Sequence, residues 1–396
     1  MKNSLLLMTL TFLVTFSFSC KEDEEPILEK TCSEKVDALK INQLQTIGSH
    51  NSYHQLLDPT IIQLLSSPLL PVPEELSPNS LDYEHLPLEE QFSNYNVRSI
   101  ELDLYNDPMG GTYANRNLFA LAGLPTASGI AALDEPGLKI LHIPDADFNT
   151  NYNTFKEALM TIRDWSNANP THLPITVLVE PKEINPADIV PQLPLTQIEF
   201  FDKSAIDGID AEIKEIFGQD LANVITPDNV RGDFATLNEA VLQDNWPLLA
   251  DSRGKILFFL LSSSNELELY LDGHAGLEGR VMFSRSAAGE PESAILLIDD
   301  PITNLAEIQQ RVQEGYIVRT RADADTEEAR TGDISRRTAA FESGAQIIST
   351  DYYKPDARNA TSEAFTDYSV QLPNQVVAVV NPINGAAEAS DCEVIE

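Results

Sequence analysis

The residues in this sequence that most clearly could do chemistry are three carboxylates in two short apolar runs. Glu101 and Asp103 lie two residues apart in VRSIELDLY, and Glu180 lies in ITVLVEPK. Alternate residues of a β-strand point to the same side, so Glu101 and Asp103 are expected on one face. Carboxylates held together repel one another unless they share a cation. With the side-chain oxygen of Asn51 they form an oxygen-only ligand set, which suits Ca2+ best, Mg2+ less well, and Zn2+ not at all.

Two histidines, His50 and His142, close two further apolar runs, LQTIGSH and LKILHI. Histidine titrates near neutral pH, so a pair of histidines beside a divalent cation can move protons onto and off oxygen. This combination favours phosphoryl or phosphodiester chemistry over acyl transfer, and the sequence contains no GxSxG motif that would favour a serine hydrolase. We interpret the neighbouring His54 as a bystander.

Eight β-like segments would have to position these side chains, each ending in polar residues and followed by a helical or irregular stretch. They span residues 44–50, 97–105, 138–143, 175–182, 255–264, 294–300, 315–323 and 345–353. This alternation predicts an α/β fold, a (β/α)8 TIM barrel, in which catalytic side chains come from the C-terminal ends of the strands. The connections after the first and fourth segments are long enough to be loop insertions over one face of the barrel. The stretch 280–287 could be an extra strand, which leaves the strand count open by one.

The charge of the chain excludes one large class of partners. The 396 residues include 26 basic and 62 acidic ones, for a formal net charge of -36. Nucleic-acid binding requires clustered Lys and Arg, so we exclude nucleic acid as a partner. A chain of this length with 42% hydrophobic residues can bury a full core. We expect a monomer with one barrel domain over residues 38–375 and a C-terminal tail over residues 376–396.

The first 37 residues are expected to lie outside the barrel. Residues 1–19 contain Lys2, an apolar run and small residues before Cys20, which is typical of a secretory signal peptide. A cysteine directly after the cleavage point resembles a bacterial lipoprotein signal, so we expect Cys20 to be lipidated and to anchor the protein to a membrane. Residues 20–37 begin with Cys20, continue with the acidic run KEDEEP, and would form a lipidated acidic tether. The expected location is the bacterial outer membrane, with either face left open, and ordinary secretion is the alternative.

The two remaining cysteines, Cys32 and Cys392, lie near opposite ends of the chain. In an oxidising compartment they could form a disulfide that ties the termini together, an arrangement that suits a barrel whose first and last elements are neighbours. Two free thiols are the alternative, and the sequence does not choose between them.

Several runs resemble, in the right order, the calcium-dependent phosphoinositide-specific phospholipase C family of secreted bacterial and fungal proteins. They are TIGSHNSYH, DYEHLPLEEQF, RSIELDLY, ILHI, ITVLVEPK, YIVRTRADADT, RR and IISTDYY, and they extend from about Leu39 to Tyr353. This family lies within a larger superfamily of phosphatidylinositol phosphodiesterases. The resemblance implies a phospholipase-C-like TIM barrel that holds one Ca2+ ion.

The resemblance also implies a role for each matching residue. The implied calcium ligands are Asn51, Glu101, Asp103 and Glu180. In the implied catalytic pair, His142 protonates the glycerol oxygen that leaves and His50 hydrogen-bonds the developing charge, while Glu180 or another carboxylate acts as the base. The implied contacts to phosphate or inositol are Lys182, Arg319 and Arg321.

The implied reaction is attack of the inositol 2-hydroxyl on the adjacent phosphodiester of a phosphatidylinositol-type phospholipid. It releases diacylglycerol and leaves a cyclic inositol phosphate, which water can then open. A glycerophosphodiesterase is the first alternative, because it shares the barrel, the two histidines and a Glu-x-Asp metal pair. The second alternative is a non-catalytic surface lipoprotein that binds head groups or glycans.

Overall fold

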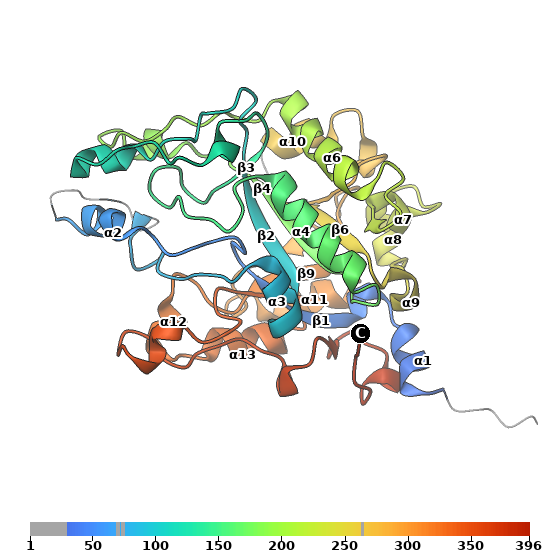
Figure 1. Ribbon diagram of the computed structural model, residues 1–396. Coiled ribbons are helices and arrows are strands. Elements are labelled where there is room, and N and C mark those ends of the chain that lie inside the picture. Colours follow the sequence, from blue (N-terminus) through green and yellow to red (C-terminus); the bar gives the residue numbers. More distant parts are fainter. Residues whose placement is uncertain (1–29, 69–71, 73–75, 263–264) are drawn as a thin grey trace, which may run out of the picture.

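A ring of eight parallel strands forms the centre of the computed structural model, which describes residues 30–68, 72, 76–262 and 265–396 (Figure 1). The order round the ring is β1 (Leu44–Ser49), β2 (Val97–Tyr105), β4 (Ile175–Pro181), β6 (Ile256–Leu260), β7 (Phe283–Ser284), β8 (Ile295–Leu297), β9 (Ile317–Arg321) and β10 (Ile347–Thr350). β10 pairs with β1, and a parallel bridge between Arg285 and Ile295 links β7 to β8. The predicted TIM barrel is confirmed.

One of the predicted barrel strands is wrong. The segment 138–143 contains only β3 (Lys139–Ile140), which runs antiparallel to the end of β2, with Leu104 opposite Ile140. Its place in the ring is taken by β7, within the stretch 280–287 that the sequence left as a possible extra strand. The short β5 (Val224–Ile225) pairs with the start of β6 on the side where β7 pairs with its end. Periodicity cannot separate a strand within the ring from one laid across its end, because both are short and apolar.

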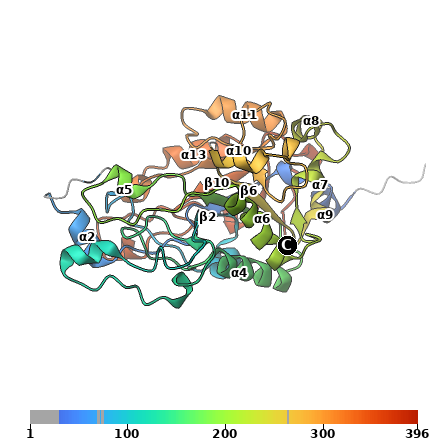
Figure 2. The same ribbon diagram turned by 90° about the horizontal axis from the view of Figure 1, so that it is seen from above.

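Helices cover the outside of the ring (Figure 2). The longer ones are α3 (Leu88–Tyr95), α4 (Phe155–Ala168), α6 (Lys203–Phe217), α11 (Leu305–Gln313) and α13 (Ser335–Glu342). Figure 2 shows α11 and α13 on one side of β2, β6 and β10 and α4 on the other. The shorter ones are α2 (Pro59–Leu65), α5 (Pro186–Ile189), α7 (Pro227–Arg231), α8 (Leu237–Leu242), α9 (Leu249–Ser252), α10 (Asn265–Leu271) and α12 (Glu327–Thr331). Short 3-10 turns include η1 (Ile41–Gln43), η3 (Asn117–Ala122), η4 (Ala131–Leu133), η5 (Ala275–Leu277), η6 (Ala357–Ala360), η7 (Pro373–Gln375) and η8 (Ala387–Ala389).

Helix α4 illustrates how the sequence fixes these outer elements. Its N-cap is Thr154, whose side chain accepts a hydrogen bond from the amide of Glu157. Phe155, Leu159 and Ile162 follow at helical spacing and are fully buried in the barrel core. The helix therefore covers the ring with one apolar face.

Long connections cover the carboxyl ends of the strands, at the left of Figure 1. Those that follow β1 and β4 were predicted to be long, and a third follows β2, where the prediction had placed a barrel strand. The three connections share a second apolar core, separate from that of the barrel. Its members include Leu57, Ile61, Leu118, Phe119, Val190 and Leu193. This shared core holds the connections together above the mouth of the barrel.

The two ends of the described chain meet at the opposite end of the barrel. α1 (Cys32–Asp37) lies beside the last residues, and a disulfide joins Cys32 to Cys392 with 5.3 Å between their Cα atoms. β11 (Val379–Val380) pairs antiparallel with the start of β1. The predicted tether therefore ends in a packed helix, and the predicted C-terminal tail is part of the fold. The predicted signal peptide, Cys20 and residues 21–29 lie outside the described residues. Among the described residues, none of the helices combines the length and the apolar composition that crossing a membrane requires.

Candidate active site

The chain turns sharply where β1 leaves the ring. Any side chain at Gly48 would force β1 and β2 to shift, because its Cβ would lie 2.9 Å from the Cβ of Ser99 on β2. Asn51 adopts a left-handed conformation with φ of 44°, which asparagine tolerates better than most residues. Ser52 then ties the turn to β2, since its amide donates to the Glu101 carbonyl at 2.9 Å and its hydroxyl accepts from the Glu101 amide at 2.8 Å. The turn thus places Asn51 beside the carboxylates of β2.

The three predicted metal-binding carboxylates form one cluster, with ligand oxygens within 4.8 Å of one another. The register of β2 and β4 sets Asp103 opposite Glu180. Asp103 is fully buried, and its Oδ1 has no hydrogen-bond partner in the described part of the chain. Burial raises the pKa of Asp103 well above its usual range, because its negative charge is not fully compensated. A buried carboxylate with an unused oxygen fits a site for a hard divalent cation.

Asn51 completes an oxygen-only set around this cluster. Its Nδ2 donates to the Tyr83 hydroxyl at 3.0 Å, which leaves the side-chain oxygen as the atom that could bind a cation. Four oxygen ligands without a sulfur or a nitrogen among them suit calcium. The residues present therefore fit the cofactor that the sequence predicted.

Lys182 lies inside the carboxylate cluster. Its Nζ is 2.6 Å from Asp103 Oδ2 and 2.9 Å from Glu180 Oε2. Burial opposes ionisation of Glu180, but the charge of Lys182 outweighs it and lowers the pKa of that carboxyl. Lys182, which was predicted to contact the substrate, is therefore paired with two predicted calcium ligands, Asp103 and Glu180.

The two predicted arginine contacts are also paired with carboxylates. Arg319 Nη2 lies 2.7 Å from Glu101 Oε2, and its Nη1 pairs with Asp299. Arg321 Nη2 lies 2.8 Å from Asp351 Oδ2. Both arginines belong to β9, whose alternation brings them to the same side as predicted.

His50 stands at the carboxyl end of β1 and is held by a carboxylate that follows β10. Its Nδ1 donates to Asp351 Oδ1 at 2.8 Å, and its Nε2 lies 3.8 Å from Glu101 Oε1. Burial opposes ionisation of Asp351, but His50 and Arg321 together hold the pKa of that carboxyl well below its usual range. The imidazole is thereby oriented with Nε2 toward the carboxylate cluster.

His142 comes from the connection above the barrel, since the strand before it is not part of the ring. Its Nδ1 lies 2.7 Å from Asp147 Oδ2. Burial lowers the pKa of His142, and the hydrogen bond and negative charge of Asp147 oppose this effect only in part. Because Nδ1 donates to Asp147, Nε2 of His142 remains for the site, as a proton acceptor in the neutral ring and as a proton donor in the imidazolium.

His54, interpreted from the sequence as a bystander, is part of the same arrangement. Its Nε2 lies 2.6 Å from Asp147 Oδ2, and its Nδ1 lies 3.0 Å from the Tyr83 carbonyl oxygen. Both partners can only accept, so both nitrogens carry protons and His54 is a buried imidazolium. Burial opposes this charge, but Asp147 outweighs it and the pKa of His54 is raised. The reciprocal effect of the two histidines, against the opposing effect of burial, lowers the pKa of Asp147 to about 2.

Sequence reasoning assigned no role to either carboxylate that holds a predicted catalytic histidine. Asp351 directly follows a predicted strand, so its place at a strand end was a usable signal. Asp147 lies in an irregular loop after Asp145, a residue with φ of 70°. The sequence around Asp147 has no hydrophobic periodicity that could have indicated its position.

A cavity of about 580 Å³ opens beside His142, Glu180 and Lys182. The apolar part of its wall includes Leu76, Ile143, Ile184, Ile189, Val190 and Leu261. Arg285, which follows β7, also lines the cavity and makes no ion pair or side-chain hydrogen bond with the described residues. It is therefore an uncompensated cation in this cavity, and the sequence had not indicated it.

These features are those of a barrel enzyme with a divalent-cation site at the carboxyl ends of its strands. The chain belongs to the family of Ca2+-dependent phosphoinositide phospholipases C, whose model matches residues 39–382. The resemblance drawn from the motifs is thereby confirmed. No curated protein matches the sequence.

Similar solved structures include three phosphodiesterases from bacteria. A calcium-dependent phosphoinositol-specific phospholipase C from Pseudomonas sp. is 16% identical, with a TM-score of 0.48 over 86% of this chain and 100% of that chain. A Ca2+-dependent phosphatidylinositol-specific phospholipase C from Streptomyces antibioticus is 18% identical, with a TM-score of 0.46 over 80% and 96%. A glycerophosphoryl diester phosphodiesterase from Parabacteroides distasonis is 10% identical, with a TM-score of 0.29 over 86% and 94%.

Proposed function

We propose that the protein is a calcium-dependent phosphodiesterase that cleaves phosphatidylinositol-type phospholipids. Its products would be diacylglycerol and a cyclic inositol phosphate that water can open. The cavity beside His142 is the observation that carries this proposal, because its lining combines charged residues with a set of apolar ones. Ile184 and Ile189 in the apolar part of the wall are 68% and 55% exposed, so this part continues to the surface where lipid would enter. A glycerophosphodiester has no acyl chain to place there.

Two histidines and one carboxylate carry the proton transfers in this proposal. His142, in its imidazolium form, gives the proton on Nε2 to the glycerol oxygen that leaves, while its Nδ1–H stays hydrogen-bonded to Asp147. His50 hydrogen-bonds the phosphate through Nε2, because its Nδ1 is engaged by Asp351. Glu180 or another carboxylate of the cluster takes the proton of the inositol 2-hydroxyl.

The metal and the basic residues complete this scheme. A Ca2+ ion held by Asn51, Glu101, Asp103 and Glu180 would lower the pKa of the attacking hydroxyl and neutralise charge on the phosphate. A bound cation would compensate the carboxylates that now pair with Lys182 and Arg319. These two side chains would then be free to contact the phosphate or the inositol ring. Arg321 would have the same task more weakly, since its partner Asp351 is outside the cluster.

Hydrolysis of a small panel of phosphodiesters tests the proposal. Protein from residue 21 onward should release diacylglycerol from phosphatidylinositol vesicles, lose this activity in chelator, and regain it with Ca2+ better than with Mg2+. Full activity in chelator would contradict the metal assignment. Equal or faster cleavage of glycerophosphoinositol and glycerophosphocholine would favour the glycerophosphodiesterase, and binding of all substrates without turnover would favour a non-catalytic lipoprotein.

We also propose that the protein is an exported lipoprotein of the outer membrane, anchored through Cys20 and monomeric. The disulfide between Cys32 and Cys392 supports export, because such bonds persist in oxidising compartments. The described chain begins at the amino end of the barrel strands, opposite the candidate site, so an anchor there would leave the site accessible. Mass spectrometry of the mature N-terminus should detect lipid on Cys20 and none in Cys20→Ala, and protease treatment of intact cells should show which face it occupies.

A further inference from the structure

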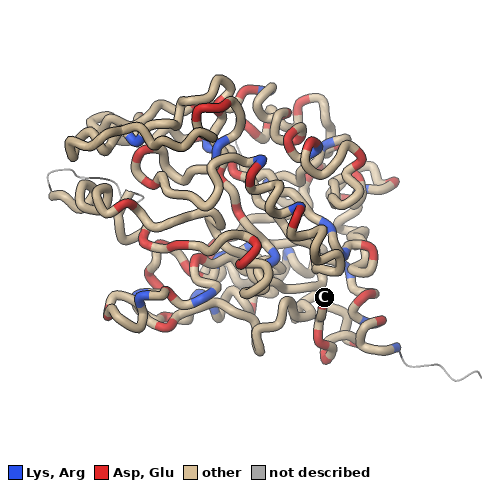
Figure 3. Tube along the Cα trace, viewed as in Figure 1, with Lys and Arg blue, Asp and Glu red and all other residues tan. Residues whose placement is uncertain are grey.

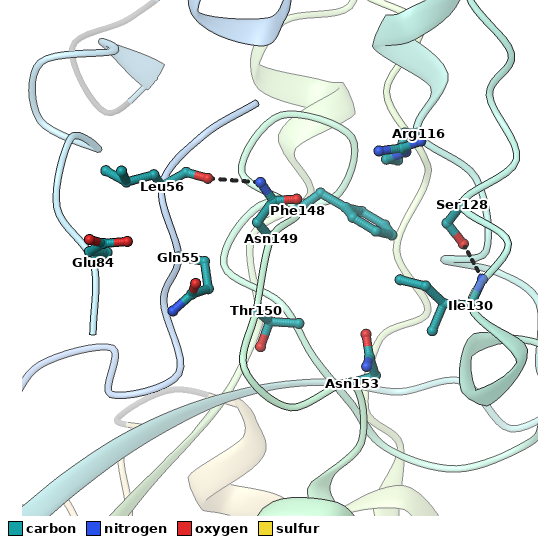
Figure 4. A pocket seen from close by; sticks show the side chains of 10 residues that line it. All are labelled: Gln55, Leu56, Glu84, Arg116, Ser128, Ile130, Phe148, Asn149, Thr150 and Asn153. Carbon is teal, nitrogen blue, oxygen red and sulfur yellow. Dashed lines mark hydrogen bonds between the residues drawn. The ribbon is translucent and has the colours of Figure 1, made fainter. Parts of the chain in front are cut away.

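A second cavity, of about 380 Å³, lies beside the candidate active site and contains none of the residues assigned to it (Figure 4). Its walls come from the connections that follow β1, β2 and β3. The lining side chains that matter here are Gln55, Glu84, Arg116, Phe148, Asn149 and Asn153. Nothing in the proposed reaction uses this cavity.

Arg116 is the cation of the second cavity, and it is uncompensated. It makes no ion pair or side-chain hydrogen bond with any described residue, and its Nε is buried without a partner. The guanidinium lies over the ring of Phe119 at 4.2 Å, which restrains its position. Acidic residues far outnumber basic ones along the trace (Figure 3). The terminal nitrogens of Arg116, which have no partner among the described residues although the chain is so acidic, are available for a ligand in the cavity.

The amide side chains in the cavity have some of their groups already engaged. Asn149 Nδ2 donates to the Leu56 carbonyl at 2.7 Å, as the dashed line in Figure 4 shows, and Gln55 Nε2 donates to the His85 carbonyl at 2.7 Å. These bonds orient both amides and leave their carbonyl oxygens as acceptors. The side chain of Asn153 has no partner among the described residues, so it offers both a donor and an acceptor.

The mixture of groups decides what kind of ligand fits. The cavity combines donors on Arg116, acceptors on the amides and on Glu84, and the ring of Phe148. A simple anion would use Arg116 alone and would meet the negative charge of Glu84. A sugar ring carries hydroxyls that donate and accept, together with an apolar face that packs on an aromatic ring. We propose that the second cavity binds carbohydrate, as one or two hexose-sized units of a glycan.

The two cavities share one short segment of chain. Asp147 holds His142 in the candidate active site, and the next two residues, Phe148 and Asn149, line the second cavity. A glycan attached to the inositol of a lipid substrate could occupy the second cavity while the phosphodiester lies at His142. A free glycan would occupy the second cavity alone. The first of these two sources rests on the proposed function, whereas the binding of carbohydrate does not.

Saturation-transfer NMR on the full mature chain tests the binding itself. Mannose, galactose and glucosamine are the probes, and inorganic phosphate tests a simple anion site. The wild type should show transfer to the sugars, and Arg116→Ala and Asn149→Ala should each weaken it about tenfold. Arg163→Ala is the matched control, because Arg163 is paired with Asp164 on the exposed face of α4. No transfer to any sugar, binding of phosphate alone, or equal weakening by the control would overturn the proposal.

Hydrolysis assays separate the two sources of the glycan. With a glycosylated and an unglycosylated phosphatidylinositol, Arg116→Ala should lower the ratio of kcat/KM for the glycosylated lipid about tenfold if the glycan belongs to the substrate. An unchanged ratio together with weakened sugar binding assigns the cavity to a free glycan. If neither lipid is cleaved, the proposed function fails while the NMR result still stands. A proportional loss on both lipids, with sugar binding intact, would show that Arg116 acts through the active site and would overturn the inference.

Discussion

The candidate site contains two histidine–aspartate pairs that share one arrangement. Asp351 holds Nδ1 of His50 at 2.8 Å, and Asp147 holds Nδ1 of His142 at 2.7 Å. In each pair the aspartate is buried, lies outside the carboxylate cluster, and binds Nδ1 of its histidine, so that Nε2 is the nitrogen left for the site. Nε2 of His50 also lies 3.5 Å from Nη1 of Arg321. In each pair the aspartate also binds a second cationic side chain. This side chain is Arg321 for Asp351 and His54 for Asp147.

Arg321 is the second partner of Asp351, and it binds the oxygen that His50 does not use. An arginine keeps its charge throughout the accessible pH range. His54 is the second partner of Asp147 and shares its Oδ2 with His142. The charge of His54 exists only because both of its nitrogens face acceptors. One pair is therefore tied to a fixed charge, and the other to a charge that a single substitution can remove.

Replacing the carboxylate of the fixed pair should have the largest effect on activity. Asp351→Asn removes the acceptor that orients His50 and leaves Arg321 without its counter-ion, so kcat/KM on phosphatidylinositol should fall about 10³-fold or more. Asp356→Asn is the matched control, because Asp356 is also buried and paired with an arginine, Arg358 at 2.7 Å. A loss of less than about tenfold, or an equal loss in the control, would contradict a positioning role for Asp351.

Replacing the carboxylate of the second pair should cost less activity and more stability. Asp147→Asn still offers an oxygen to one histidine but leaves the His54 imidazolium buried without a counter-ion. The free energy of unfolding should fall by about 3–5 kcal/mol, and kcat/KM by about 10²-fold. Urea unfolding and initial rates measure the two effects. Adding His54→Gln to Asp147→Asn should restore part of the lost stability, and no restoration would contradict the assigned charge of His54.

The same carboxylate gives a prediction for acid stability. The folded-state pKa of Asp147 is lowered to about 2, whereas an unfolded chain has an aspartate value of about 4. Its contribution to stability is therefore present above about pH 4 and is lost as the pH falls toward 2. Stability measured across this window should fall less steeply in Asp147→Asn than in the wild type. If stability falls equally steeply with pH in the wild type and in Asp147→Asn, other carboxylates dominate acid unfolding.

Replacing His54 should change the pKa of His142 without removing a catalytic group. His142 is faced by Asp147, His54 and Lys182. In His54→Gln the charge of Asp147 is no longer shared, so the pKa of His142 rises and the basic limb of the kcat/KM profile moves up by about one pH unit. His85→Gln is the control, because burial lowers the pKa of His85 to about 3 and the residue is neutral. A shift in both variants, or a shift to lower pH, would contradict the charge assigned to His54.

Strand ends made the ligand side of the site predictable, while the loops did not. Glu101, Asp103 and Glu180 could be placed together because alternation within strands and the register of parallel strands follow from the sequence pattern. The roles of these residues came from the resemblance. Asp147 and the charge of His54 could not be predicted, because they depend on how two loops from distant parts of the chain meet. The ring itself was predicted, although the segment 138–143 was misplaced within it.

A change at the other end of the barrel should separate stability from charge. Cys32→Ser with Cys392→Ser opens a loop of 360 residues, which in the chain-entropy model costs about 6 kcal/mol, so Tm should fall by several degrees. The disulfide lies at the amino end of the strands, and no described contact joins it to either histidine–aspartate pair. At 25 °C, kcat/KM should stay within about twofold of the wild type, and the pH profile should keep its basic limb. A moved limb would mean that loosening the fold alone shifts the pKa of His142, and the effect of His54→Gln could then no longer be assigned to its charge.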